Sequence, residues 1–352
     1  MGPEWVAGWT ESVARALSEL GCTVHVFYYV QTSTAQRVNR ARRWFARSLG
    51  GTYRVSPAWM RSTYWRLAGF RIAGPLVRAA RAFRPDVVVV LKGEALNAQT
   101  LLRLKDATGA ALASWWVDDP YAFERQCGLR NVAETLPLYD RVFIFDREYL
   151  RSLKERGIEG VQFLPCAADP LLYHPQMLSE SEREAYAASV SLVGVHFESR
   201  GQVVHELLGE PGLRIWGPGW DMFLAEHLGG AADLRYRGDS LAPAEVAKVY
   251  CASLINLNTH HSQSKWGGLN TRAFEIPAAG GFQLLDHVGG LEELFEPGRE
   301  VAVYEKPDQA AEIVRRYISD HGGRQRIARA GRERVMAEHT YRHRMATVLN
   351  SI

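Results

Sequence analysis

Hydrophobic and polar positions alternate along the chain in two series of short apolar runs, each run followed by a stretch with helical spacing. The first series predicts strands at 86–91, 111–117, 141–145 and 161–164. The second predicts strands at 190–195, 213–216, 254–257, 282–285 and 301–303. Short buried strands that alternate with helices are typical of a parallel sheet with helices on both faces. The pattern therefore predicts an α/β protein with two similar halves.

Helical spacing of apolar residues predicts helices at 10–20, 33–49, 60–83, 97–107, from 148, from 308 and at 324–337, with Thr10 and Asp308 as N-caps. The polar, proline-marked segment Pro170–Ala188 predicts a linker. We therefore expect an N-terminal domain at 1–175 and a second domain at 188–338, with a C-terminal helix at 339–352 that could return to the first. Two such domains would bind ligands in a cleft at the carboxyl ends of their strands.

The start of the chain departs from the usual order of such a domain. Residues Cys22–Tyr29 predict a strand, but the helix before them follows a loop-like opening, GPEWVAGWT, with no strand in front of it. A doubly wound domain normally places its first strand at the centre of the sheet, where a gap would leave backbone groups unpaired. We therefore expect the natural product to begin upstream, with about six to ten apolar residues that form this strand.

Composition limits the class of protein. The 352 residues are 47% hydrophobic and 23% charged, which is typical of a globular protein. No apolar run approaches the ~20 residues that span a bilayer, and the start lacks the pattern of a secretory signal. The four cysteines lie far apart, without the spacing of a zinc site or a disulfide framework. A reducing cytoplasm is the expected location.

The net charge of +3 hides an asymmetry. Residues 1–84 contain thirteen arginines and only three acids, a balance of +10, so the remaining residues carry −7. The general preference of this chain for Arg over Lys does not explain the missing acids. The N-terminal region could therefore face an anionic acceptor or the inner face of a membrane. Nucleic-acid binding is the weaker interpretation, because no recognisable module is present.

The richest chemistry lies between Leu254 and Asp286. Here Arg272 and Glu275 stand on a predicted helix that is followed by the glycine turn Gly280–Gly281. Glu275 could accept both ribose hydroxyls of a nucleotide, and Arg272 with backbone N–H groups could hold diphosphate oxygens. A purely structural Glu275–Arg272 pair fits the same residues. His260 and His261 have no third ligand at metal spacing, so we expect loop residues and no metal site.

Other candidates follow predicted strand ends. In the second half, Gly217 permits close backbone approach, and Trp216 could lie near a nucleotide base or simply be buried. In the first half, Asp118 and Asp119 follow a strand and could take a proton from an acceptor or cap the next helix. Lys92 ends another strand and is a further catalytic candidate.

Three stretches, NTRAFEIPAAGGFQLLDH, GREVAVYEKPDQ and RIARAGRERVMAEHTYRHR, resemble the glycosyltransferase domain of the spore maturation protein CgeB family. WWVDDP, YDRVFIFDREY and LPCAADP resemble the N-terminal half of the same proteins. The resemblance covers most of the chain from about residue 85. It implies a GT-B fold, in which two Rossmann-like domains face across a cleft and the second holds the nucleotide-sugar, without a bound metal or other cofactor.

The resemblance also implies roles for single residues. Glu275 matches the glutamate that binds the donor ribose, Asn270 stands in the same donor motif, and Arg200 matches a basic position that contacts donor phosphates. A second glutamate, eight positions before the first in those retaining enzymes, is replaced here by Gly267. The stereochemical outcome and the sugar therefore stay open.

The sequence predicts a metal-independent glycosyltransferase that moves a sugar from a nucleotide to an unidentified acceptor. Two other functions remain compatible with the same residues. One is a nucleotide-sugar epimerase on the same fold, and the other is a non-catalytic sugar- or nucleotide-binding protein, which the replacement of the second glutamate would suit.

Overall fold

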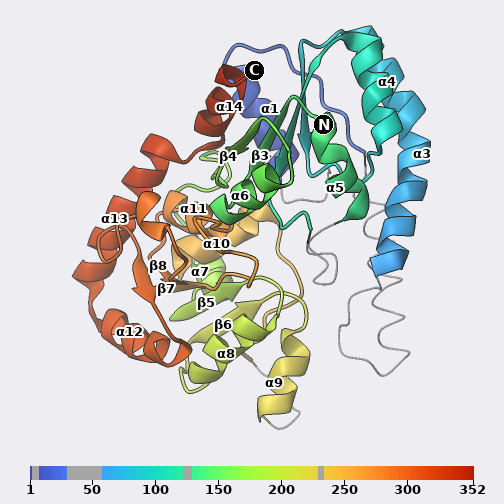
Figure 1. Cartoon of the computed structure of the whole chain (residues 1–352). Helices are drawn as coiled ribbons and strands as arrows, with labels where there is room; N and C mark the ends of the chain where they lie inside the picture. The colour runs from blue at the N-terminus through green and yellow to red at the C-terminus, as the bar shows by residue number, and fades with distance from the viewer. Residues whose placement is uncertain (2–7, 30–57, 122–128, 229–233) are drawn as a thin grey trace. The chain divides into compact units, whose positions relative to one another are not determined.

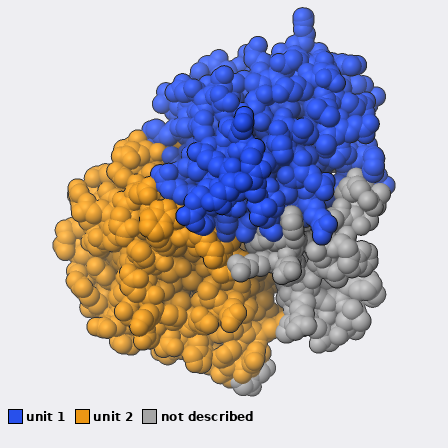
Figure 2. Space-filling view, viewed as in Figure 1, with its two compact units in different colours: residues 1–165, 342–352 blue, residues 166–341 orange. Residues whose placement is uncertain are grey.

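A computed structural model describes residues 1, 8–29, 58–121, 129–228 and 234–352 (Figure 1). The predicted helix at 33–49 lies outside these residues. The chain divides into two compact units, which Figure 2 shows in different colours. Unit 1 comprises Met1–Pro165 and Arg342–Ile352, and unit 2 comprises Cys166–Tyr341.

Unit 1 is built on a parallel sheet of four strands in the order β1-β2-β3-β4. The strands are β1 (Val87–Leu91), β2 (Ala111–Trp116), β3 (Arg141–Ile144) and β4 (Val161–Phe163). The helices are α1 (Trp9–Glu19), α3 (Ala58–Phe83), α4 (Ala98–Thr108), α5 (Arg130–Thr135), α6 (Arg147–Glu155) and α14 (Tyr341–Asn350), with a short 3₁₀ turn, η1 (Leu136–Leu138). All four strands lie where the apolar runs predict them.

Local sequence explains where the helices of unit 1 begin and end. The side chain of Asn97 accepts the backbone N–H of Thr100 at 2.8 Å and starts α4, and Gly109 ends it in the left-handed conformation. Asp146 caps α6 in the same way through the N–H of Glu148. Thr10 is not the predicted cap, because α1 already begins at Trp9 and Thr10 is buried within its first turn.

The predicted strand at Cys22–Tyr29 is wrong: residues 22–27 have no regular structure in this unit. A strand requires a neighbour with which to form its ladder, and the described sheet ends at β1. The backbone of Met1 pairs with that edge, since its amino group donates to Val89 O at 2.6 Å and its carbonyl accepts the N–H of Leu91 at 2.8 Å.

Unit 2 contains a second parallel sheet, with five strands in the order β6-β5-β7-β8-β9. The strands are β5 (Val190–Val193), β6 (Leu213–Trp216), β7 (Ile255–Asn258), β8 (Gln283–Asp286) and β9 (Ala302–Tyr304). The helices are α7 (Glu180–Tyr186), α8 (Glu198–Glu206), α9 (Trp220–Leu228), α10 (Pro243–Ala252), α11 (Arg272–Ala278), α12 (Pro307–Ser319) and α13 (His321–Glu338), with a 3₁₀ turn, η2 (Leu291–Glu293).

The strand order of unit 2 fixes where a ligand is expected. The chain moves outward from β5 to β6, then returns to the other side of β5 to form β7. The loops after β5 and β7 therefore diverge, and this topological switch point is where open α/β sheets bind ligands.

The predicted linker is wrong, because Pro170–Ala188 belongs to unit 2 and contains α7. Ser179 and Glu182 form a capping box, which gives the polar SESERE run a helical start. Glu182 also pairs with Lys248 of α10 at 2.6 Å. Asp308 is likewise not an N-cap, since α12 begins at Pro307 after Lys306.

The core of unit 2 is formed by strand residues that the helices cover. Val190, Leu192, Ile255, Leu257 and Leu284 are essentially inaccessible to solvent. Burial of each such side chain stabilises the fold by about 1.5–3 kcal/mol. The loops at the carboxyl ends of these strands are therefore carried on a rigid base. Of the helices within the described residues, none has the length and apolarity needed to cross a membrane.

Candidate functional site

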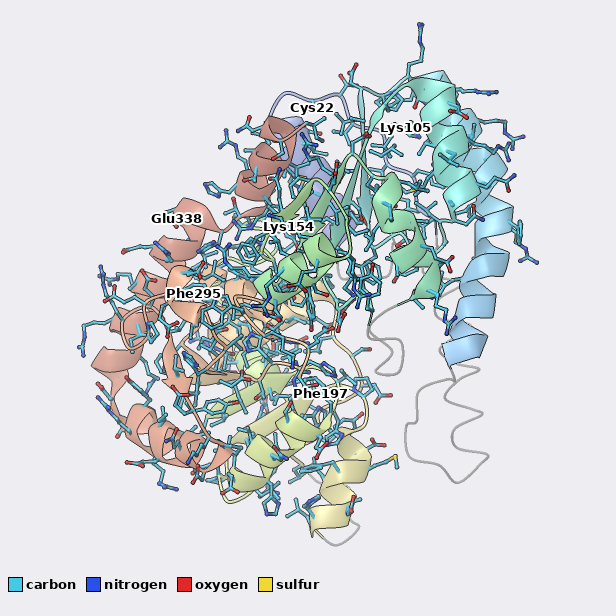
Figure 3. The ribbon with its side chains drawn as sticks, in the orientation of Figure 1. Cys22, Lys105, Lys154, Phe197, Phe295 and Glu338 are labelled. Carbon is cyan, nitrogen blue, oxygen red and sulfur yellow. The ribbon has the colours of Figure 1, made fainter. Side chains whose placement is uncertain are left out.

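Arg200 lies at the start of α8, directly after the switch-point strand β5. Its side chain is buried, with 4% of the residue exposed. Its Nε donates to Thr259 O at 3.0 Å and its Nη1 donates to Val195 O at 2.9 Å. The guanidinium also stacks on the ring of Phe197, labelled in Figure 3, at 4.1 Å. These contacts fix the guanidinium between the loops that follow β5 and β7.

Arg272 approaches the same point from α11. A Cβ atom added to Gly194 would lie 2.5 Å from Nη1 of Arg200 and 2.6 Å from Nη2 of Arg272. The two guanidinium groups therefore meet over Gly194, the residue that follows β5. Gly217, after β6, is equally constrained, because its own Cβ would lie 2.1 Å from Gly194 O. Glycine at both positions lets the backbone make room for the arginine pair.

The arginine pair forms no ion pair within the described residues, although the charges of Asp286 and Glu275 lie near it. Within the described residues, no salt bridge joins Arg200 or Arg272 to a carboxylate. Burial, and then the nearby charge of Arg272, lowers the pKa of Arg200. Two adjacent cations without an ion pair are costly in a partly desolvated place. Planar guanidinium groups in this arrangement can bind the oxygens of a phosphate or diphosphate.

Glu275 lies one turn after Arg272 on α11. The hydroxyls of Tyr173 and Thr271 lie close enough to its carboxyl to lower the pKa of that group. Burial raises the pKa of Glu275 to about 7, and the charge of Arg272 opposes that shift. The ring of Tyr173 packs 6.2 Å from that of Tyr250. The structure thus brings together three predicted donor residues, Arg200, Arg272 and Glu275, and adds Tyr173, which the sequence did not single out.

Asn270 and His260 have defined structural partners in the same loop. The Asn270 amide exchanges hydrogen bonds with that of Asn258, at 2.9 and 3.1 Å, and its Oδ1 accepts the N–H of Ala273 at the start of α11. His260 is buried and its Nδ1 lies 2.7 Å from Asp286 Oδ1. These contacts stiffen the loop that leads to Arg272. No group of three or more potential metal ligands occurs in the described part of the chain.

Three predicted donor residues lie elsewhere or point inward. Gly280 and Gly281 end α11 and precede β8, so they lie at the amino end of the strand and away from the arginine pair. A Cβ on Gly281 would collide with the carbonyl of Tyr250, so this glycine is needed for packing. Trp216 is buried, with 2% exposed, and presents no surface for a base.

In unit 1, Lys92 and Asp118 form an ion pair at the carboxyl ends of β1 and β2. The Nζ of Lys92 lies 2.7 Å from Asp118 Oδ2 and 3.8 Å from Glu94 Oε1. Lys92 adopts φ 62°, a left-handed conformation that is rare for residues other than glycine, and Gly93 follows at φ 77°. Such backbone strain is often retained at functional sites. Asp119, by contrast, accepts the N–H of Tyr121 at 2.9 Å and acts as a turn cap.

Glu94 is a buried acid beside this pair that the sequence did not single out. The Tyr29 hydroxyl lies 2.5 Å from Glu94 Oε2 and 3.0 Å from Leu91 O, and it accepts the N–H of Gly93. One hydroxyl proton cannot serve two acceptors, so all contacts are satisfied when Glu94 donates to Tyr29 and Tyr29 donates to Leu91. Burial raises the pKa of Glu94, which agrees with a protonated carboxyl that donates to Tyr29.

Comparisons with known proteins find one matching family and several solved structures with a similar fold. Residues 200–350 match the family described as "Glycosyl transferase-like". A glycosyltransferase from Rickettsia africae is 13% identical, with 99% of this chain and 95% of that chain covered and a TM-score of 0.63. No protein of a curated set matches the chain by sequence.

Two further solved structures share the fold. HepE from Anabaena, in complex with UDP-glucose, is 12% identical, with 80% of this chain and 82% of that chain covered and a TM-score of 0.57. Sucrose-phosphate synthase from Thermosynechococcus elongatus is 14% identical, with 80% and 78% covered and a TM-score of 0.58.

These findings confirm the predicted fold, an α/β GT-B architecture with two parallel sheets. The family match confirms the predicted enzyme class, a glycosyltransferase, for the part of the chain that holds Arg200, Arg272 and Glu275. It does not distinguish the CgeB family from other glycosyltransferases of this kind.

Proposed function

We propose that the chain transfers a sugar from a UDP-sugar to an acceptor hydroxyl, with Arg200, Arg272 and Glu275 as the donor-binding residues. The observation that carries this proposal is the convergence of two guanidinium groups over Gly194, without a carboxylate partner among the described residues. The choice of UDP is supported by the UDP-glucose complex of HepE, which has the same fold.

The donor would be held by groups that match its chemistry. Arg200 and Arg272 would bind the diphosphate through charge-assisted hydrogen bonds. The ionised carboxylate of Glu275 would accept hydrogen bonds from the ribose hydroxyls, while Tyr173 holds its other lone pairs. Asn258, Asn270 and the His260–Asp286 pair would keep the loop between β7 and α11 in place.

The arginine pair would also stabilise the leaving group. When the bond between the anomeric carbon and the phosphate oxygen breaks, negative charge develops on the nucleoside diphosphate. Two positioned guanidinium groups can stabilise that charge without reorganising solvent. We therefore propose that transfer needs no bound metal and no cofactor other than the nucleotide-sugar itself.

Unit 1 would supply the residues that act on the acceptor. Asp118 would take the proton of the acceptor hydroxyl as its oxygen bonds to the anomeric carbon. Lys92 would hold the Asp118 carboxylate in position through the ion pair of 2.7 Å. The acceptor itself is proposed only as a hydroxyl compound, for which the arginine-rich N-terminal region favours an anionic one.

A thermal-shift screen with UDP-, GDP-, dTDP- and CMP-sugars tests the donor assignment. The proposal expects a rise in Tm with UDP-sugars that exceeds the rise with the other three. A selective response to another nucleotide would replace UDP but keep the site. No response to any of the four would remove the donor-binding role of the site.

The two other functions can be separated by the products. An epimerase would convert the sugar of the donor without an acceptor and without releasing free sugar. A binding protein would respond in the thermal-shift screen but would turn over no donor with any acceptor pool. Release of UDP that depends on an added acceptor is the result expected for the transferase.

A further inference from the structure

A basic pocket lies in unit 2 at the amino ends of the strands, whereas the arginine pair lies at their carboxyl ends. It is formed between α10, the start of β8 and α13, and has a volume of about 400 Å³. Gly280 and Gly281, which precede β8, lie in its wall. All of α11 separates them from Arg272, roughly 10 Å at 1.5 Å per residue. A ligand in this pocket therefore occupies a place distinct from the proposed donor site.

Three arginines stand among the residues that line this pocket. Arg324, Arg329 and Arg332 all come from α13, and none of the described lining residues is an Asp or Glu. Arg329 and Arg332 are three residues apart, so they share one face of the helix. Arg324 is tied to the carbonyls of Tyr317 and Ile318 at the end of α12. The pocket thus combines a fixed cation with two further guanidinium groups.

Two residues that line the pocket each carry a buried polar atom that has no hydrogen-bond partner within the described structure. These atoms are Oγ of Ser253, whose residue is 8% exposed, and Nε of Arg332. Both atoms carry a hydrogen that can be donated. Buried donors are normally paired, so each exception calls for an acceptor. An anion with several oxygens, bound among the three arginines, would supply acceptors for both.

We propose that this pocket binds the phosphate group of a small phosphorylated molecule. Guanidinium groups bind phosphate oxygens in pairs, and the volume suits a small ligand rather than a chain segment. Because it lies at the amino ends of the strands, the ligand takes no part in sugar transfer. It acts as an effector that stabilises unit 2. The proposal stands independently of the donor assignment.

Calorimetric titration of the full chain with inorganic phosphate tests this site. Two variants are compared with the natural chain: Arg329→Gln/Arg332→Gln in the pocket, and Arg326→Gln as an exposed control on the same helix that does not line the pocket. We expect the double variant to weaken phosphate binding at least tenfold, while Arg326→Gln binds as the natural chain does. The arginine pair of the proposed donor site is intact in both variants, so phosphate that binds there contributes equally.

Several results would overturn the proposal. They are the absence of phosphate binding by the natural chain, and equal affinity in the natural chain, the double variant and Arg326→Gln. Circular dichroism checks that the double variant is folded, and Ser253→Ala, which removes one orphan donor, provides a milder second test. Binding to phosphatidic-acid vesicles without any response to free phosphate would assign the pocket to a lipid headgroup and contradict the small-molecule ligand.

Discussion

At the scale of single residues, the proposed role of Glu275 would link protonation to donor binding. Its pKa of about 7 means that a large part of the population carries a proton at neutral pH. A carboxyl group whose pKa is raised by folding stabilises the folded state at pH values below its pKa in the unfolded chain. That contribution is lost as the pH rises through the folded pKa of about 7. Donor binding should follow the opposite trend, because the ribose hydroxyls need the ionised carboxylate as acceptor.

We predict that affinity for a UDP-sugar increases by roughly tenfold between pH 6 and pH 8, as the carboxylate population rises with a pKa of about 7. Calorimetry across this range measures the change, and a nucleotide-sugar is the proper ligand because its diphosphate does not titrate there. Glu275→Gln should weaken binding at pH 8 and abolish most of the pH dependence. An unaltered pH profile in that variant would remove the assignment.

Glu94 makes a separate prediction about unit 1. The raised pKa of its carboxyl means that it stabilises the fold while protonated, and that this contribution is lost as the pH rises through the folded pKa. Lys92, Asp118 and the phenols of Tyr29 and Tyr139 are the ionisable groups around it. Glu94→Gln keeps a hydrogen-bond donor toward Tyr29 but cannot ionise.

As the pH rises above 4.5, the ordinary pKa of a Glu carboxyl, the Tm of the natural chain should therefore fall relative to the Tm of Glu94→Gln. Thermal unfolding of both proteins in a series of buffers provides the comparison. Since Glu275 titrates in both, its effect cancels in the difference between the two curves. If Tm depended on pH in the same way in both proteins, Glu94 would not be protonated in the folded chain, and it could not donate a hydrogen bond to Tyr29.

At the scale of secondary-structure elements, the proposed donor site depends on the close approach of the loops after β5 and β6. Gly194 and Gly217 have φ of 149° and 144°, which favour glycine, and each lacks room for a Cβ. We predict that Gly194→Ala displaces both guanidinium groups and weakens UDP-sugar binding by tenfold or more. Gly209→Ala, where nothing lies within 4 Å of the added atom, is the matched control. Equal donor affinity in the two variants would contradict this geometry.

The elements also show what could be predicted from sequence. The strands β1 to β9 follow from apolar runs because burial on both faces leaves a pattern that local reading detects. The strand at 22–29 was predicted from Val and aromatic content alone, yet pairing depends on a neighbour that the local sequence does not contain. The linker was misread because the SESERE run is polar, although its Ser and Glu form the capping box of α7.

The site was partly predictable for a similar reason. Arg272 and Glu275 could be found from one segment, and Arg200 from a resemblance. Tyr173 and Glu94 were missed because their roles arise from partners distant in sequence, Glu275 and Tyr29. Gly280 and Gly281 were assigned to the donor because they follow Glu275 closely in sequence. In the structure, α11 separates them from Arg272, and they lie at the amino ends of the strands.

At the scale of the whole molecule, the account expects turnover without a divalent metal. The described residues contain no cluster of metal ligands, and the arginine pair can stabilise the leaving diphosphate instead. Acceptor-dependent release of UDP should therefore continue in EDTA at a rate close to that without it. Activity that EDTA abolishes and Mn²⁺ or Mg²⁺ restores would contradict the metal-independent mechanism.

The central claim is that the guanidinium groups over Gly194 bind the diphosphate of a UDP-sugar. Titration calorimetry of UDP-glucose into the natural chain and Arg272→Gln tests it most directly, with Arg326→Gln as the control for loss of one arginine charge. Removal of a charged hydrogen-bonding partner costs about 1.5–3 kcal/mol, so Arg272→Gln should bind roughly 10- to 150-fold more weakly while Arg326→Gln is unchanged. Equal affinity in the natural chain and in a folded Arg272→Gln variant would contradict the account.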